Sequence, residues 1–185
     1  MARKKAPSLE VWPEGTVFTV GHSTLSIDDF AALLAGYGIQ AVVDIRTVPR
    51  SRRNPQFNAD ALPQALAAHG VEYVGLPGLG GLRKPLKESP NRGWRNDSFR
   101  GYADYMQTPA FSAALDQLID ISTRKRVAIM CAEAVPWRCH RSLVADALEI
   151  RGIPAEEILS RTSHRRHKLT PFARVQGTSL TYPAA

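Results

Sequence analysis

Apolar residues along this chain form short runs and helical stripes that follow one another in alternation. The run at residues 16–20 is β-branched and aromatic, which predicts a first strand. From Ile27 to Leu34, apolar residues recur at the i, i+3, i+4, i+7 spacing of an amphipathic helix, and Ser26 is its expected N-cap. Residues 40–46 then predict a buried second strand with charged residues at its far end.

The rest of the chain continues this alternation. Asp60 is the expected cap of the next helix, and Pro63 falls in the first turn, where its missing N–H would have had no partner. Residues 77–97 show no periodicity, and a loop of this length inside a domain is usually functional or mobile. The remaining predicted elements are strands at 71–76, 127–130 and 158–159, and helices at 98–106, from 109 onward and at 142–151.

Strands that alternate with helices predict an α/β fold with a mostly parallel sheet and helices on both faces, in three layers. The length of 185 residues and the hydrophobic content of 44% fit one domain with a substantial core. We assign residues 15–185 to this single domain and residues 1–14 to a flexible basic tail. No apolar run is long enough to cross a membrane, and the basic N-terminus lacks the apolar stretch of a secretory signal. We therefore expect a cytoplasmic protein with no membrane partner.

Basic residues gather in the segments that leave the carboxyl ends of the predicted strands. The net charge is +7, and 15 of the 24 lysines and arginines lie in residues 46–53, 77–97, 132–141 and 161–168. Ligands of open α/β sheets bind outside these strand ends, so the pattern indicates an anionic partner. That partner would be a small anion, a nucleotide or a nucleic acid. The alternative is that the charge only solvates the surface.

Four aromatic residues lie in or beside the long loop. They are Trp94, Phe99, Tyr102 and Tyr105. Exposed aromatic rings beside basic residues can stack on nucleic-acid bases. Ordinary packing on a helix face is the alternative, above all for Phe99 and Tyr102, and the sequence leaves both interpretations open.

Both cysteines of the chain lie between Cys131 and Arg141, directly after the apolar run at 127–130. A thiol at a strand end, close to a helix N-terminus and to arginines, is expected to have a lowered pKa and to be nucleophilic. Two other interpretations stay open. The cysteines can be small buried hydrophobic residues, or they can bind zinc with nearby histidines, although their spacing differs from the usual C-x-x-C pattern. We assign no metal ligand, and the sequence indicates no particular cofactor.

The candidate site residues follow a predicted strand or begin the helix after it. Glu133 is a candidate general acid or base, with a salt bridge to Arg138 or Arg141 as the alternative. The catalytic candidates are Cys131, Glu133, Cys139, His140 and Asp44. The candidates for substrate binding are His22, Ser23, Arg46, Ser51, Arg138, Arg141, Arg165 and His167.

Several short motifs together resemble one bacterial family, catalogued as domain of unknown function 488. The motifs are Gly21-His22-Ser23, Asp44-Ile45-Arg46 with Pro49 and Ser51, Leu79-Gly80-Gly81, Cys131-Ala132-Glu133, Cys139-His140-Arg141 and Thr181-Tyr182-Pro183. The resemblance covers roughly residues 15–183 and implies a small cytoplasmic α/β protein, with no particular activity. The order of strand, cysteine loop and helix is also similar in topology to rhodanese-like domains, although six rather than five residues separate Cys131 from Arg138.

Three hypotheses about function follow. The first is an enzyme, for example a thiol-dependent transferase or hydrolase, that acts on a phosphate-bearing substrate, a nucleotide or a nucleic acid. The second is a nucleic-acid-binding protein without catalysis, and the third is a structural metal-binding module. The sequence indicates neither the reaction nor the oligomeric state.

Overall fold

The computed structural model describes residues 11–185, and its central sheet confirms the predicted α/β fold. Six strands lie in the order β3-β2-β4-β1-β5-β6, all parallel except β6, which pairs antiparallel with β5. They are β1 (Val17–Gly21), β2 (Ala41–Asp44), β3 (Glu72–Gly75), β4 (Val127–Cys131), β5 (Ala155–Ser160) and β6 (Ser163–Arg166). A separate hairpin consists of β7 (Arg174–Gln176) and β8 (Ser179–Thr181). Residues 1–10 of the predicted basic tail lie outside the described residues.

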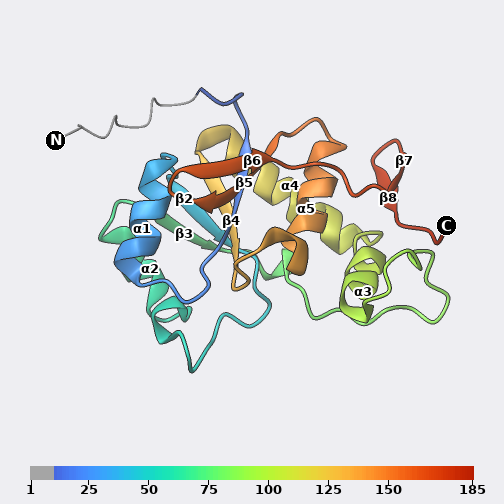
Figure 1. Cartoon of the computed structure of the whole chain (residues 1–185), viewed down its shortest axis with the longest axis horizontal. Helices are drawn as coiled ribbons and strands as arrows, with labels where there is room; N and C mark the ends of the chain where they lie inside the picture. Colours follow the sequence, from blue (N-terminus) through green and yellow to red (C-terminus); the bar gives the residue numbers. More distant parts are fainter. Residues whose placement is uncertain (1–10) are drawn as a thin grey trace.

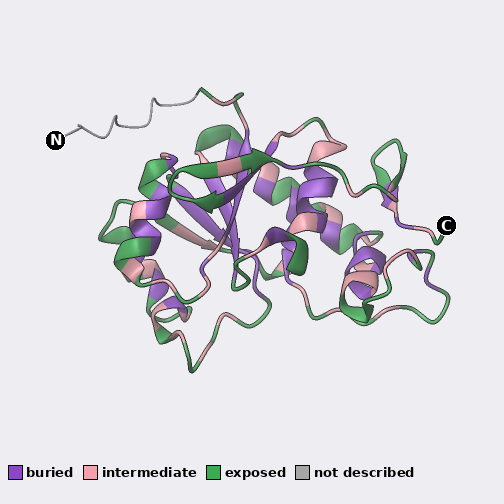
Figure 2. Ribbon diagram, viewed as in Figure 1, coloured by how far each residue is buried: buried purple, intermediate pink, exposed green. Residues whose placement is uncertain are grey.

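Helices cover both faces of this sheet, as predicted (Figure 1). The α-helices are α1 (Ile27–Gly36), α2 (Leu62–Ala67), α3 (Asp97–Tyr105), α4 (Pro109–Arg124) and α5 (Arg141–Glu149). Short 3-10 helices are η1 (Pro55–Phe57), η2 (Pro77–Leu79) and η3 (Pro136–Arg138). One apolar core lies between the sheet and α1 with α2, and the other between the sheet and α3, α4 and α5. Figure 2 shows the buried strands between these two layers. Among the described residues, no helix is both long and apolar enough to span a membrane.

Two of the five predicted helix starts are confirmed and three are shifted by one residue, including that of α5, which was predicted at residue 142 and begins at Arg141. Ser26 accepts a hydrogen bond from the backbone of α1, and Thr108 does the same for α4. Asp60 does not cap α2, which begins one residue later with Ala61 at the N-cap and no side-chain bond. The helix predicted at 98–106 begins at Asp97, because the side chain of Asn96 accepts from two backbone N–H groups there.

The C-terminal third differs most from the prediction. The strand predicted at 158–159 spans Ala155–Ser160, and β6 next to it was not predicted. The sequence of β6 is polar, so the hydrophobic pattern does not predict a strand there. In the structure, Arg165 and Arg166 lie directly across the ladder from Glu157 and Glu156. Cross-strand pairs of opposite charge stabilise such a polar edge strand in place of apolar burial.

The long loop at 77–97 is held by one buried carboxylate. Asp104 of α3 accepts hydrogen bonds from the Leu86 backbone at 2.8 Å, Ser89 Oγ at 2.6 Å and Asn91 Nδ2 at 2.8 Å. Asn91 Oδ1 in turn accepts from the Tyr182 backbone at 2.8 Å. The loop and the C-terminal segment are therefore fixed to each other through α3.

The aromatic residues near this loop serve packing. Tyr102 is buried and donates to the Leu79 carbonyl, and Trp94 stacks on Phe99 with ring centroids 4.8 Å apart. Tyr105 has the Arg83 guanidinium 3.6 Å from its ring centre. The packing interpretation therefore accounts for Phe99, Tyr102 and Tyr105, whereas Trp94 also lines a cavity described below.

Candidate functional site at the carboxyl edge of the sheet

The three central strands end side by side, which brings the signature motifs together. β4 lies between β2 and β1, so Asp44 pairs in register with Met130, and Gly21 with Cys131. Side chains alternate between the two faces of a strand. Met130 packs in the core under α1 and α2, so Cys131 faces the α5 side, whereas Asp44 follows Val43 of the α5-side core and faces α1 and α2. The candidate residues at the ends of β2 and β4 therefore lie in two clusters, one on each face.

The sulfur cluster lies on the α5 side and consists of Cys131, Cys139, His140 and Arg141. Both cysteines are buried free thiols, with their sulfur atoms 2.6 Å apart. Arg141, which is fully buried, places Nη1 2.7 Å from Cys131 Sγ. The same guanidinium donates to the Glu133 carbonyl at 2.5 Å and to the Ala134 carbonyl at 3.0 Å. We call residues 131–141 the thiol loop. The Arg141 guanidinium therefore links the backbone of this loop to the sulfur of Cys131.

The two thiols have opposite pKa shifts. Burial alone would raise the pKa of Cys131, but the hydrogen bond from Cys139, the charge of Arg141 and its hydrogen bonds lower that pKa to about 7. The pKa of Cys139 is raised well above the ordinary thiol range, because Cys139 donates to Cys131 and is buried. Near neutral pH, Cys131 is thus the thiolate of the pair and Cys139 the protonated thiol.

His140 contacts the second thiol as a neutral imidazole. Burial, together with the Arg141 charge, lowers the pKa of His140 to about 4, so the imidazole is neutral at pH 7. Its Nε2 lies 3.0 Å from the Ile45 carbonyl and must carry the proton, since a carbonyl only accepts. Nδ1 is then the free lone pair, and it lies 3.6 Å from Cys139 Sγ.

Two glycines of the motifs allow this close approach. A Cβ on Gly21 would lie 1.7 Å from the Glu133 carbonyl oxygen and 2.7 Å from Arg141 Nη1. A Cβ on Gly81 would lie 3.0 Å from His140 Nδ1. The backbone of β1 also fixes the loop, because the His22 N–H donates to the Cys131 carbonyl at 3.0 Å. The sulfur cluster is therefore in close contact with two of the motifs, Gly21-His22-Ser23 and Leu79-Gly80-Gly81.

The His22 cluster lies on the opposite face and consists of His22, Asp44, Arg46, Phe57 and Tyr73. Arg46 forms a bidentate pair with Asp44, at 2.8 and 2.7 Å, and also donates to the Phe57 carbonyl at 2.6 Å. Tyr73 donates to Asp44 at 2.7 Å, and His22 stacks on Phe57 with Nε2 3.3 Å from Arg46 Nη1. Burial and the Arg46 charge lower the pKa of His22, so the imidazole is neutral and accepts from Arg46.

Other predicted residues of the edge have more peripheral positions. The Glu133 side chain is exposed, and the contact of this residue with Arg141 runs through its backbone carbonyl instead. Ser23 adopts a positive φ of 47° at the turn after β1, and Ser51 Oγ accepts from the backbone N–H groups of Arg53 and Asn54. Arg138 is exposed on η3.

Arg165 and His167 belong to a third cluster, beyond the first turn of α5. Buried His167 lies between Glu157 at 2.8 Å and Asp146 at 2.7 Å, and Tyr182 donates to the same Asp146 at 2.8 Å. Burial would lower the pKa of His167, but these two carboxylates raise it to about 9. Arg165 also pairs with Glu157. Sequence reasoning missed Asp146 and Glu157 and named Tyr182 only as part of a family motif, because only the fold brings the three together.

Much of the predicted basic rim is engaged by the protein itself. Arg46 and Arg141 are buried in the two clusters, whereas Arg165 and Arg166 pair with Glu157 and Glu149. Exposed basic side chains without an ion pair to another described residue include Arg50, Arg52, Arg53, Arg138 and Lys168. Among the described residues, no group of three or more His, Cys, Asp or Glu side chains is arranged to hold a metal ion.

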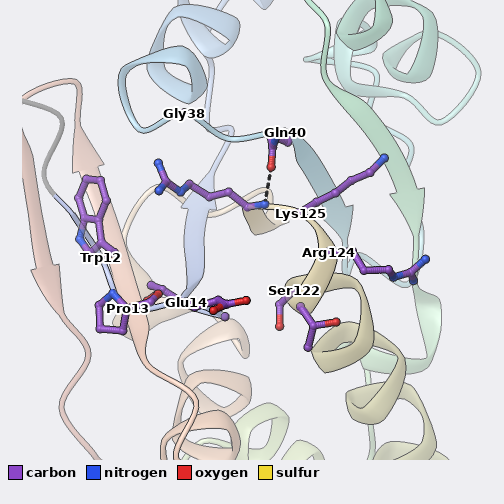
Figure 3. Close-up of a pocket in the computed structure, with 12 residues that line it drawn as sticks. Trp12, Pro13, Glu14, Gly38, Gln40, Ser122, Arg124 and Lys125 are labelled. Carbon is purple, nitrogen blue, oxygen red and sulfur yellow. Dashed lines mark hydrogen bonds between the residues drawn. The ribbon is translucent and has the colours of Figure 1, made fainter.

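A cavity lies at the opposite edge of the sheet from these clusters, near the amino ends of β1, β2 and β4 (Figure 3). Its cationic residues already have partners. Arg124 pairs with Asp120, Lys125 with Glu72, and Arg126 donates to the Tyr37 carbonyl. Among the described residues, no cysteine or histidine lines this cavity.

The comparison with protein families agrees with the motifs. The family described as Domain of unknown function DUF488 matches residues 26–148, about two thirds of the chain. The chain belongs to this family. The match includes Asp44, Arg46 and the whole thiol loop, whereas Gly21-His22-Ser23 and Thr181-Tyr182-Pro183 lie outside it. No curated protein and no solved structure matches the chain.

Proposed function

We propose that this DUF488 protein is a thiol-dependent enzyme that acts on an anionic substrate, with Cys131 as the nucleophile and Cys139 as the resolving thiol. The observation that carries the proposal is the contact of one sulfur with both a buried guanidinium and a second thiol. A guanidinium stabilises the thiolate form, and the second thiol is already within reach of the first. A cytoplasmic location, as the sequence predicts, would keep both thiols reduced between turnovers.

The reaction that uses both thiols is a two-electron exchange. The Cys131 thiolate forms a bond to an electrophilic sulfur of the substrate, and the bond from that sulfur to its leaving group breaks, so the leaving group departs as a thiolate. Cys139 then attacks Cys131 Sγ, and its proton passes to the departing substrate thiolate. This step forms the Cys131–Cys139 disulfide and releases the second substrate thiol, so the substrate is reduced and the protein oxidised. A dithiol reductant would restore the enzyme.

The roles of two predicted substrate-binding arginines change in this proposal. Arg141 stabilises the thiolate and the loop carbonyls, and Arg46 neutralises Asp44, so neither guanidinium binds the substrate. The anionic group of the substrate would instead bind exposed cations of the same edge, among them Arg138 on η3.

The pH dependence of thiol alkylation tests this proposal. We expect the rate of iodoacetamide modification at Cys131 to follow a midpoint near pH 7, and diamide to yield the intramolecular Cys131–Cys139 disulfide, both followed by mass spectrometry. Arg141→Met should move the midpoint upward by at least one pH unit, which lowers the thiolate fraction at pH 7 by about fivefold or more. Arg138→Gln, which removes an exposed arginine of the same loop, is the matched control and should leave the midpoint unchanged. A wild-type midpoint at pH 8.5 or above would contradict the proposal.

A second candidate function is nucleic-acid binding by the segment after β2. Arg50, Arg52 and Arg53 are exposed and have no ion pair to another described residue, so they are available for phosphates. Affinity for a duplex oligonucleotide should then fall steeply with salt, by about one logarithmic unit per decade of salt for each phosphate contact. Replacing the three arginines by glutamine should flatten that slope. An affinity that is the same at low and high salt would exclude this candidate.

A further inference from the structure

A cavity of about 580 Å³ opens on the far side of the first turn of α5 from the sulfur cluster. Its lining residues are Trp94, Trp137, Ser142, Glu157, Arg165, Arg166, His167, Lys168, Thr170, Pro171 and Phe172. Volumes of roughly 300–1,000 Å³ are typical of sites for small molecules and cofactors. We call it the aromatic cavity, because three large aromatic side chains contribute to its wall.

We propose that the aromatic cavity binds a nucleotide, with the base on its aromatic wall and the phosphate on Lys168 and Arg165. The inference deepens the proposed function. It rests on that function only in treating the bound nucleotide as part of the substrate of the thiol chemistry. Binding itself is argued from the cavity alone.

The aromatic wall offers surfaces on which a base can stack. Trp137 is 58% exposed, which is unusual for so large an apolar side chain, and the Arg165 guanidinium lies 5.2 Å from its ring centre. Trp94 and Phe172 contact each other edge to face at 4.9 Å on another part of the wall. The buried Trp94 Nε1 has no hydrogen-bond partner among the described residues.

The charged part of the cavity favours a phosphate. Lys168 is exposed and has no ion pair to another described residue. Arg165 uses Nε for Glu157, and its side chain remains 51% exposed. His167 is engaged at both ring nitrogens by carboxylates, and Arg166 is engaged by Glu149, so these two groups serve the protein instead. The two remaining cations, Arg165 and Lys168, are three residues apart in the sequence, and Arg165 also lies over the ring of Trp137 from the thiol loop.

The position of the cavity connects binding to the thiol loop. Trp137 belongs to that loop, and Ser142 follows it directly at the start of α5, where its Oγ donates to the Cys139 carbonyl at 3.0 Å. A ligand that contacts these two residues would touch the segment that carries the resolving thiol. The thiol loop thus contributes residues to both the aromatic cavity and the sulfur cluster.

Calorimetric titration of the full chain with AMP tests the assignment, with adenosine and inorganic phosphate as partial ligands. We expect AMP to bind with saturation, and both partial ligands to bind at least tenfold more weakly. Trp137→Ala should weaken AMP binding about tenfold by removing a stacking surface. Lys168→Gln should weaken it about tenfold by removing a charged hydrogen-bond donor. Leu86→Ala and Lys87→Gln, which alter exposed side chains of another loop, are the matched controls and should leave the affinity unchanged.

A short single-stranded oligoadenylate distinguishes the two sources of this ligand. Binding at least tenfold tighter than AMP would assign the site to a nucleotide within a strand, and equal or weaker binding would assign it to a free nucleotide. Absence of saturable binding for both probes, or unchanged affinity in both variants, would overturn the inference. Cys131→Ser keeps the two proposals separable: AMP binding in this variant is expected to be unchanged, whatever the alkylation experiment shows for the thiol.

Discussion

Two buried arginines lie at the same edge of the sheet, on opposite faces, and they differ in what neutralises them. Arg46 has a carboxylate partner, Asp44, in a bidentate pair. Arg141 has no carboxylate within ion-pair distance among the described residues and instead contacts the sulfur of Cys131. A buried cation requires a counter-charge. A carboxylate supplies it throughout the neutral range, whereas a thiol supplies it only after losing its proton.

This difference separates a pair with mutually satisfied charges from one in which a thiol must ionise to supply the counter-charge. The charges of Arg46 and Asp44 satisfy each other, and their remaining hydrogen bonds go to Phe57 and Tyr73. At Arg141, the same need for a negative charge favours ionisation of Cys131. The fold therefore favours the thiolate form of Cys131 with the same kind of buried charge that, at Arg46, is already neutralised by a carboxylate.

The largest expected effect concerns the Arg46–Asp44 pair. Asp44→Asn leaves Arg46 buried without its counter-charge, which should lower the free energy of unfolding by about 3–5 kcal/mol. Urea denaturation followed by circular dichroism measures this loss. Asp97→Asn, which breaks an exposed pair with Arg100, is the control and should change stability by less than about 1 kcal/mol. Equal effects of the two substitutions would show that burial does not distinguish these pairs.

The second prediction concerns the pH dependence of the Arg141–Cys131 pair. The pKa of Cys131 is about 7 in the folded protein, below its ordinary value of 9.0. The unfolded state therefore binds more protons between these values, and the stability from the thiolate is present above pH 9 and lost as pH falls through 7. The stability of the wild type relative to Cys131→Ser should thus increase by roughly 2–3 kcal/mol from pH 6 to pH 9.

Urea unfolding at a series of pH values measures this dependence. Ala132→Ser, at an exposed position of the same loop, is the control, and its difference from the wild type should not change with pH. A flat difference for Cys131→Ser as well would mean that the thiol is not the counter-charge of Arg141.

The third prediction concerns the close contact of β1 with the thiol loop. Gly21→Ala would place a Cβ against the Glu133 carbonyl and Arg141 Nη1, so the loop must shift. We expect a loss of about 2 kcal/mol in stability and a higher pKa of Cys131, measured by the alkylation profile. Gly36→Ala in α1 is the control, because its nearest new contact is an ordinary 3.7 Å and alanine favours a helix. An unchanged alkylation profile in Gly21→Ala would contradict the role assigned to this glycine.

The smallest effect is expected at the rim of the Arg46–Asp44 pair. Tyr73→Phe removes the hydrogen bond to Asp44 but leaves the Arg46 pair intact, and Tyr73 is only half-buried, so water can replace the hydroxyl. The stability should fall by about 1 kcal/mol without any change in thiol reactivity. A change in the alkylation midpoint of this variant would show that the two faces of the sheet are coupled.

Local patterns predicted the parts of the fold whose signals lie within one element. The helical stripe after Ser26 and the apolar strands are examples, because periodicity and capping depend on neighbouring residues. The prediction missed β6, whose charged residues are stabilised across the ladder, and misplaced the cap of α2. Asp44 and Cys131 lie on opposite faces of the sheet. Side-chain alternation along each strand underlies this difference, but the register between β2 and β4 is needed to deduce it.

The sequence by itself determined the alternation of strands and helices, the basic character of the segments after the strands, and the proximity of Cys131, Cys139 and Arg141 along the chain. Tertiary structure alone decided which charge each buried arginine meets. It also brought Trp94, Trp137 and Phe172 from three separate segments to one cavity. The physical reason is that burial and counter-charge depend on strand register and packing between distant segments, whereas a sequence pattern records only what each segment requires locally.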